Sequence, residues 1–150
     1  MHHATNHPWD RLILSCLLIF SISCSQVRLI QEYDEVTDRQ ITSMQEKFAR
    51  FFVKMRKQAG MPEGNYAKYE SFYDDVRTQL NVLEVRNRAI PRTDITNDII
   101  SSLEKEVDLL ENLHRMGFTT YDEVIPVKYA MESSFAAMLK FQLALKSRIK

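Results

Sequence analysis

The sequence predicts an all-α protein: an antiparallel up-and-down four-helix bundle with an extended first helix, preceded by an N-terminal hydrophobic segment. The chain has only three glycines and four prolines in 150 residues, so it has little material for turns. Charged residues make up 27% of it, and apolar residues recur at every third or fourth position, as on one face of a helix. Few turns, many charges and helical periodicity together indicate a few long helices.

The first helix is expected over residues 27–58, which at 1.5 Å per residue is about 48 Å long. That length exceeds the length of its neighbours, so we expect its N-terminal part to project beyond the bundle. The loop at residues 59–65 contains Gly60, Pro62 and Gly64 and ends the helix. The apolar stripe of this first helix consists of Ile30, Tyr33, Thr37, Ile41, Met44, Phe48, Phe51 and Met55.

The second and third helices are bounded by proline and glycine. The second is expected over residues 66–89, because Ile90 precedes Pro91 and the residue before a proline is disfavoured in a helix. The third begins with Thr93 or Thr96 as its N-cap and ends before Gly117, which suits the left-handed position after a helix. The expected core stripes are Tyr69, Phe72, Tyr73, Val76, Leu80 and Leu83, then Ile99, Leu103, Val107, Leu110 and Leu113, onto which Phe118 folds back.

The fourth helix follows Thr120 and Glu123, which have the spacing of a capping box. Pro126 leaves two alternatives: a single turn precedes it and the helix restarts there, or the helix bends at that point. The expected core residues are Val127, Met131, Phe135, Met138 and Leu145. We interpret Met44, Met55, Met131 and Met138 as core-filling residues rather than copper ligands.

The apolar run at residues 12–23 ends directly before Cys24. A membrane-spanning helix needs about 20 apolar residues, whereas a run of 7–15 followed by small residues is typical of a signal peptide. We therefore expect residues 1–23 to be a lipoprotein signal peptide, cleaved between Ser23 and Cys24, with lipid attached to Cys24. Arg11 makes only a weakly basic start, and Ser21 stands where leucine is usual.

Two alternatives to cleavage remain open. Val27, Leu29 and Ile30 continue the apolar character, which would suit an uncleaved signal anchor of an inner-membrane accessory subunit. The second alternative is that this segment forms a buried N-terminal helix of a soluble protein. With cleavage, residues 24–150 form one helical-bundle domain, and residues 24–35 form its stalk. Cys16 is then removed, so no intramolecular disulfide can form.

Residue chemistry argues against several functions. The formal net charge is zero, so we expect no nucleic-acid partner. His114 is the one histidine left after cleavage, and with Glu111 it supplies a single Glu-x-x-His motif where a di-iron site needs two. We interpret His114 as a structural residue near a helix end, and no acidic residue falls on the expected apolar stripes. We therefore predict no catalytic residues, no metal, no cofactor and no enzymatic activity.

Residues 24 to about 147 resemble a group of small uncharacterised bacterial lipoproteins. The resemblance rests on Cys24 followed by the segments 27–30, 32–35, 51–54, 60–64, 83–86 and 89–91. It implies a lipid-anchored, all-helical mature domain but carries over no activity. Similarity to lipoprotein sorting in Gram-negative bacteria implies that Ser25 after Cys24 favours the outer membrane, facing the periplasm, over the inner membrane.

The preferred functional hypothesis is a non-enzymatic envelope protein that binds another envelope protein or itself. Phe51 with Phe52, and Phe72 with Tyr73, place aromatic side chains next to each other, and one of each pair is expected in a partly exposed partner surface. The alternative is that both members fit a wide core stripe. A further hypothesis is a bundle that binds an apolar small ligand such as a lipid or a quinone.

Overall fold

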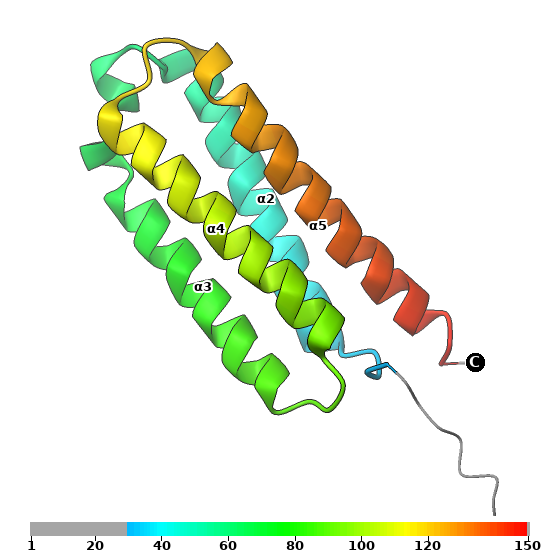
Figure 1. Ribbon diagram of the computed structural model, residues 1–150. Helices are drawn as coiled ribbons and strands as arrows, with labels where there is room; N and C mark the ends of the chain where they lie inside the picture. Colours follow the sequence, from blue (N-terminus) through cyan, green and yellow to red (C-terminus); the bar gives the residue numbers. More distant parts are fainter. Residues whose placement is uncertain (1–29, 150) are drawn as a thin grey trace, which may run out of the picture.

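The computed structural model describes residues 30–149, and these form an antiparallel four-helix bundle (Figure 1). α2 lies beside α3 and α5, and α4 lies beside the same two helices, so the four helices form a closed ring. The predicted all-helical bundle is confirmed. The helices are α2 (Glu35–Gln58), α3 (Glu70–Arg88), α4 (Asp94–Met116) and α5 (Ile125–Lys146), with single 3-10 turns η1 (Pro62–Gly64), η2 (Tyr66–Lys68) and η3 (Tyr121–Glu123).

The first helix begins later than expected. Asp34 is the N-cap of α2, and its carboxylate accepts a hydrogen bond from the Thr37 backbone N–H at 3.0 Å. α2 has 24 residues, close to the 23 of α4 and the 22 of α5, so the described chain contains no extended first helix. Gln31 is buried and accepts a hydrogen bond from the Thr96 hydroxyl at 2.6 Å.

The expected stalk is therefore only partly visible. Residues 24–29 lie outside the described residues, whereas residues 30–34 lie against the bundle through Gln31 and Asp34. At the other end of the chain, α5 finishes near the start of α2, so both ends of the described chain lie at the same end of the bundle (Figure 1). Among the described helices, none combines the length and the apolar character needed to span a membrane.

The core faces agree with the expected stripes in three helices and differ in α4. Ile100 is buried in place of Ile99, which lies partly exposed. Glu111 and His114 are buried as well, so the inward face of α4 is rotated from the expected one. The four methionines expected in the core are buried, and α5 adds the buried Gln142 to its expected face.

The loops at the end away from the chain termini are held together by backbone contacts. Gly60 has a φ of 80°, and its N–H donates to the Phe118 carbonyl at 2.9 Å. Gly117 has the expected positive φ, at 89°. The Phe118 ring stacks on the imidazole of His114 at 4.7 Å, whereas we expected it to fold back on Leu113.

The two sequence signals before α5 have different outcomes. The predicted capping box is wrong, because the Glu123 carboxylate accepts from the Thr119 N–H and Thr120 makes no side-chain cap. The first alternative for Pro126 is confirmed: the turn η3 comes first, and Pro126 then lies in the opening turn of α5. Proline is tolerated there because that turn has no intrahelical acceptor for its missing N–H.

Candidate functional site

The predicted site residues are placed as follows. Ser23 and Cys24 lie outside the described residues. Phe51 and Phe52 are 2% and 3% exposed, so both members of this pair fit the wide core, as the alternative interpretation held. Tyr73 is 1% exposed, whereas Phe72 is partly exposed. The four aromatic residues therefore form no continuous exposed patch.

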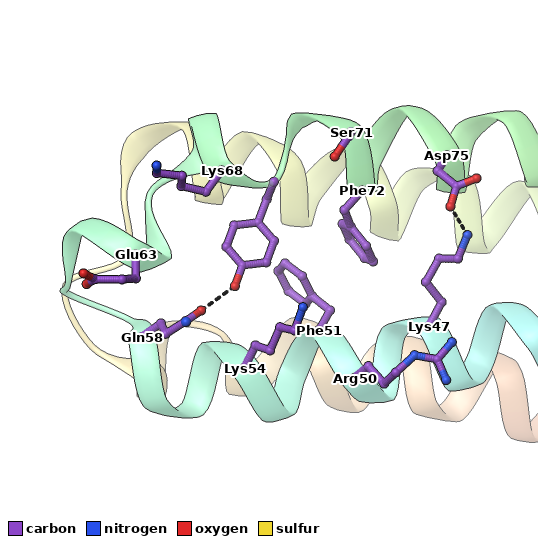
Figure 2. Close-up of a pocket in the computed structure, with 11 residues that line it drawn as sticks. Lys47, Arg50, Phe51, Lys54, Gln58, Glu63, Lys68, Ser71, Phe72 and Asp75 are labelled. Atoms are coloured by element: carbon purple, nitrogen blue, oxygen red, sulfur yellow. Dashed lines mark hydrogen bonds and ion pairs between the residues drawn. The ribbon is translucent and has the colours of Figure 1, made fainter.

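A cleft of about 660 Å³ nevertheless opens beside these residues, between the second half of α2 and the start of α3 (Figure 2). Phe51, Tyr69 and Phe72 provide its aromatic wall. Phe51 and Phe72 stack with their ring centroids 4.6 Å apart, and Tyr69 meets Phe51 edge-on at 5.4 Å. The Tyr69 hydroxyl donates to the Gln58 side-chain oxygen, which holds that ring in place.

The rim of the cleft is predominantly basic. Four cationic side chains and two carboxylates line it: Lys47, Arg50, Lys54, Lys68, Glu63 and Asp75. Lys47 pairs with Asp75 across the cleft, and the exposed Arg50 lies 3.5 Å from Glu46 one turn earlier. Within residues 30–149, the side chains of Lys54 and Lys68 make no hydrogen bond or ion pair. Figure 2 shows Lys54 extending from α2 toward α3, so its charge lies at the mouth of the cleft.

A second hollow of about 220 Å³ lies along the same α2–α3 seam, on the other side of the Lys47–Asp75 pair in the sequence of both helices. Gln40 from α2 and Gln79 from α3 line it. The Oε1 atoms of both glutamines are buried and have no hydrogen-bond partner in the described chain. Buried polar atoms are normally paired, so these two oxygens leave hydrogen-bonding capacity unused beside the hollow.

Behind the cleft, His114 lies fully buried among aromatic rings. Its Nε2 is 2.7 Å from the Gly64 carbonyl oxygen and its Nδ1 is 2.9 Å from the Tyr73 hydroxyl. A carbonyl only accepts, so Nε2 carries the proton and Tyr73 donates to Nδ1. Burial lowers the pKa of His114 and raises the pKa of Tyr73, which keeps both groups neutral.

Glu111 is buried beside this histidine, at 6% exposure, and corrects the expectation that no acidic residue would face the core. It accepts hydrogen bonds from the Tyr66 hydroxyl at 2.7 Å, from Nε of Arg77 at 3.0 Å and from Arg115 at 2.7 Å. Burial by itself raises the pKa of Glu111, but the hydrogen bonds from Arg77, Arg115 and Tyr66 outweigh it and lower the pKa to about 2.

Glu111 and His114 share one face of α4, as their spacing predicts, and all their polar atoms have protein partners. No group of three or more His, Cys, Asp or Glu side chains within residues 30–149 is arranged to hold a metal ion. Through these hydrogen bonds, His114 holds the loop at Gly64 against α4, and both residues link α3 to α4. The arrangement suited to a ligand is the cleft, with its basic rim and aromatic wall.

Sequence reasoning missed the basic side of this cleft. Lys47, Arg50 and Lys54 follow one another by three and four positions, the spacing that places residues on one face of a helix. That pattern was available in the sequence, whereas the contributions of Tyr69 and Lys68 depend on how η2 and the N-cap of α3 lie beside α2. Comparison of the chain with known protein families, with curated proteins and with solved structures finds no match.

Proposed function

We propose that this protein is a non-enzymatic, lipid-anchored module of the bacterial cell envelope that binds another envelope protein through the α2–α3 cleft. The observation that carries the proposal is the cleft itself, with four cationic side chains around an aromatic wall. Stacked and edge-on aromatic rings form a rigid apolar surface, and binding to such a surface requires little further ordering of side chains. Interface centres combine these features, because aromatic residues and arginine are enriched there.

The position of the cleft suits a tethered protein. The described chain begins at one end of the bundle, and the cleft lies toward the opposite end, where α2 finishes and α3 starts (Figure 1, Figure 2). The 24 residues of α2 span about 36 Å. A bundle held to a membrane through lipid on Cys24 would present the cleft away from that membrane and toward other proteins.

The anchor is the first part to test. Replacing Cys24→Ala in the full chain should abolish incorporation of radioactive palmitate and leave an unprocessed chain of higher mass. The matched control is Cys16→Ala, which lies inside the expected signal peptide and should change neither result. Unchanged mass and unchanged membrane association of Cys24→Ala would instead show an uncleaved signal anchor.

The binding function is tested by photocrosslinking in intact cells. A benzoylphenylalanine placed at position 54, on the cleft, should yield one defined adduct with another envelope protein. The same residue placed at position 140, on the exposed face of α5, should not. The adduct should weaken when Arg50→Glu is added. Recovery of only uncrosslinked monomer at position 54 would contradict the proposal.

A further inference from the structure

We propose that the α2–α3 seam binds an acidic peptide segment of a partner protein, with an aromatic or aliphatic side chain next to its carboxylates. This inference rests on the proposed function, because it describes the chemistry of the partner. The cleft and the second hollow occupy neighbouring stretches of the α2–α3 seam, with the Lys47–Asp75 pair between them.

The charge of the cleft selects an acidic occupant. Four cations face two carboxylates, and one of these carboxylates, Asp75, is already paired with Lys47. Lys54 and Lys68 make no ion pair among the described residues, so a carboxylate that approaches either side chain would displace no internal partner. Complementary charge of this kind speeds encounter and disfavours basic segments.

The aromatic wall selects the neighbouring side chain. Phe51 and Phe72 stack in parallel, and Phe72 is partly exposed at the cleft. An aromatic or aliphatic side chain placed on this surface buries apolar area, which favours binding. A ligand with carboxylates alone leaves this surface exposed to water, so the cleft favours a segment that carries both kinds of group.

The second hollow indicates a chain rather than a small anion. From Lys54 back to Gln40, α2 rises over fourteen residues, or about 21 Å. An extended peptide covers that distance in about six or seven residues. The side chains of Gln40 and Gln79 line this hollow, and rotation of either side chain would turn its amide group toward the backbone of a peptide there. A free anion in the cleft would not contact these two side chains, which lie outside the cleft.

The test is a selection of random twelve-residue peptides, displayed on phage, against the full chain purified in detergent. Selected peptides should be enriched in Asp and Glu next to Phe, Tyr, Trp or Leu. A synthetic peptide of the selected consensus should bind at least tenfold more weakly to the double variant Arg50→Glu/Lys54→Glu. The double variant Gln40→Leu/Gln79→Leu should weaken binding at least threefold.

The matched control is Arg56→Glu/Lys57→Glu, which makes the same change of charge on the same helix at exposed residues that line neither hollow. It should bind the peptide within twofold of the wild type. Circular dichroism and urea unfolding of all variants establish that they are folded. Equal weakening by both charge-reversing variants would overturn the proposal, as would a selected consensus without acidic residues or no enrichment at all.

Two further probes separate other sources of negative charge. Inorganic phosphate, compared at matched ionic strength with NaCl, should not displace the peptide, and complete displacement would indicate a small-anion site instead. Phosphatidylglycerol vesicles should not displace the peptide from the protein, and displacement that depends on Arg50 and Lys54 would indicate a membrane-binding surface instead. If these results overturn the acidic peptide while the crosslink at position 54 persists, the proposed function stands with a partner of different chemistry.

Discussion

The carboxylate of Asp34 accepts from two different parts of the bundle, because it caps the start of α2 and also receives Nε of Arg86 at 2.7 Å. The second carboxylate oxygen receives the other arm of the same guanidinium, also at 2.7 Å. This bidentate ion pair links the beginning of α2 to the last turn of α3. The hydrogen bonds from Arg86 hold the pKa of Asp34 well below its usual range, so the pair persists at neutral pH.

Replacing Asp34→Ala should lower the free energy of unfolding by about 1–2 kcal/mol. The loss of an N-cap costs about 1 kcal/mol, and the partly exposed ion pair adds a smaller amount. Asp34→Asn keeps a capping oxygen and should cost less than Asp34→Ala. Urea unfolding monitored by circular dichroism measures both. Equal losses for the two variants would show that the cap contributes nothing.

His114 should make the bundle sensitive to mild acid. Burial lowers its pKa, so the unfolded chain takes up a proton near pH 6.5 before the folded chain does. The stability that this contributes is complete above pH 6.5 and decreases as the pH falls below it, by up to about 1.4 kcal/mol per pH unit. Urea unfolding between pH 7.5 and pH 5.5 measures the slope.

The control for this slope is His114→Gln, whose amide N–H can still donate to the Gly64 carbonyl but does not titrate. This variant should be less stable at pH 7.5 and should show a flatter dependence on pH. The other three histidines lie at residues 2, 3 and 7, within the expected signal peptide. A slope that is unchanged in His114→Gln would assign the acid sensitivity to other groups.

Glu111→Gln should destabilise the bundle by about 1–3 kcal/mol at pH 7, because Arg77 and Arg115 lose a buried anionic partner while remaining partly exposed themselves. The pKa of Glu111 is lowered to about 2 in the folded chain. Its contribution is therefore present above pH 4.5 and is lost as the pH falls toward 2. The difference between wild type and variant should shrink over that interval, and a constant difference would contradict the role of charge.

Gly60 and Gly117 form a matched pair for a test of the loop contact. Both have positive φ, but a Cβ at Gly60 would lie 2.5 Å from the Thr119 carbonyl oxygen, whereas one at Gly117 would meet nothing within 4 Å. Gly117→Ala should cost about 1 kcal/mol for the backbone conformation alone. Gly60→Ala should cost more, about 2–3 kcal/mol, because the clash adds to the same strain. Thermal unfolding of the two variants compares them, and equal losses would exclude the clash.

In α4, the apolar repeat predicted only part of the buried face. Leu103, Val107 and Leu110 belong to both the expected and the observed inward face. The flanking residues differ: Ile100 and His114 are buried in place of Ile99 and Leu113, which are partly exposed. Hydrophobicity favours leucine over histidine at a core position, so the prediction that Leu113 is buried was wrong. His114 is buried because Tyr73 and the Gly64 carbonyl satisfy both its nitrogens.

The sequence by itself determined the helical class, the helix number and the C-terminal ends of the first three helices, because glycine, proline and a 3.6-residue apolar repeat act within one segment of chain. The tertiary structure decided which polar residues could be buried, since Glu111 needs Arg77 from α3 and Tyr66 from η2 in addition to Arg115 of its own helix. It also decided the cleft, whose wall and rim come from α2, α3 and the turns that connect them. The periodicity of a single helix does not reveal a hydrogen-bond partner that another element supplies.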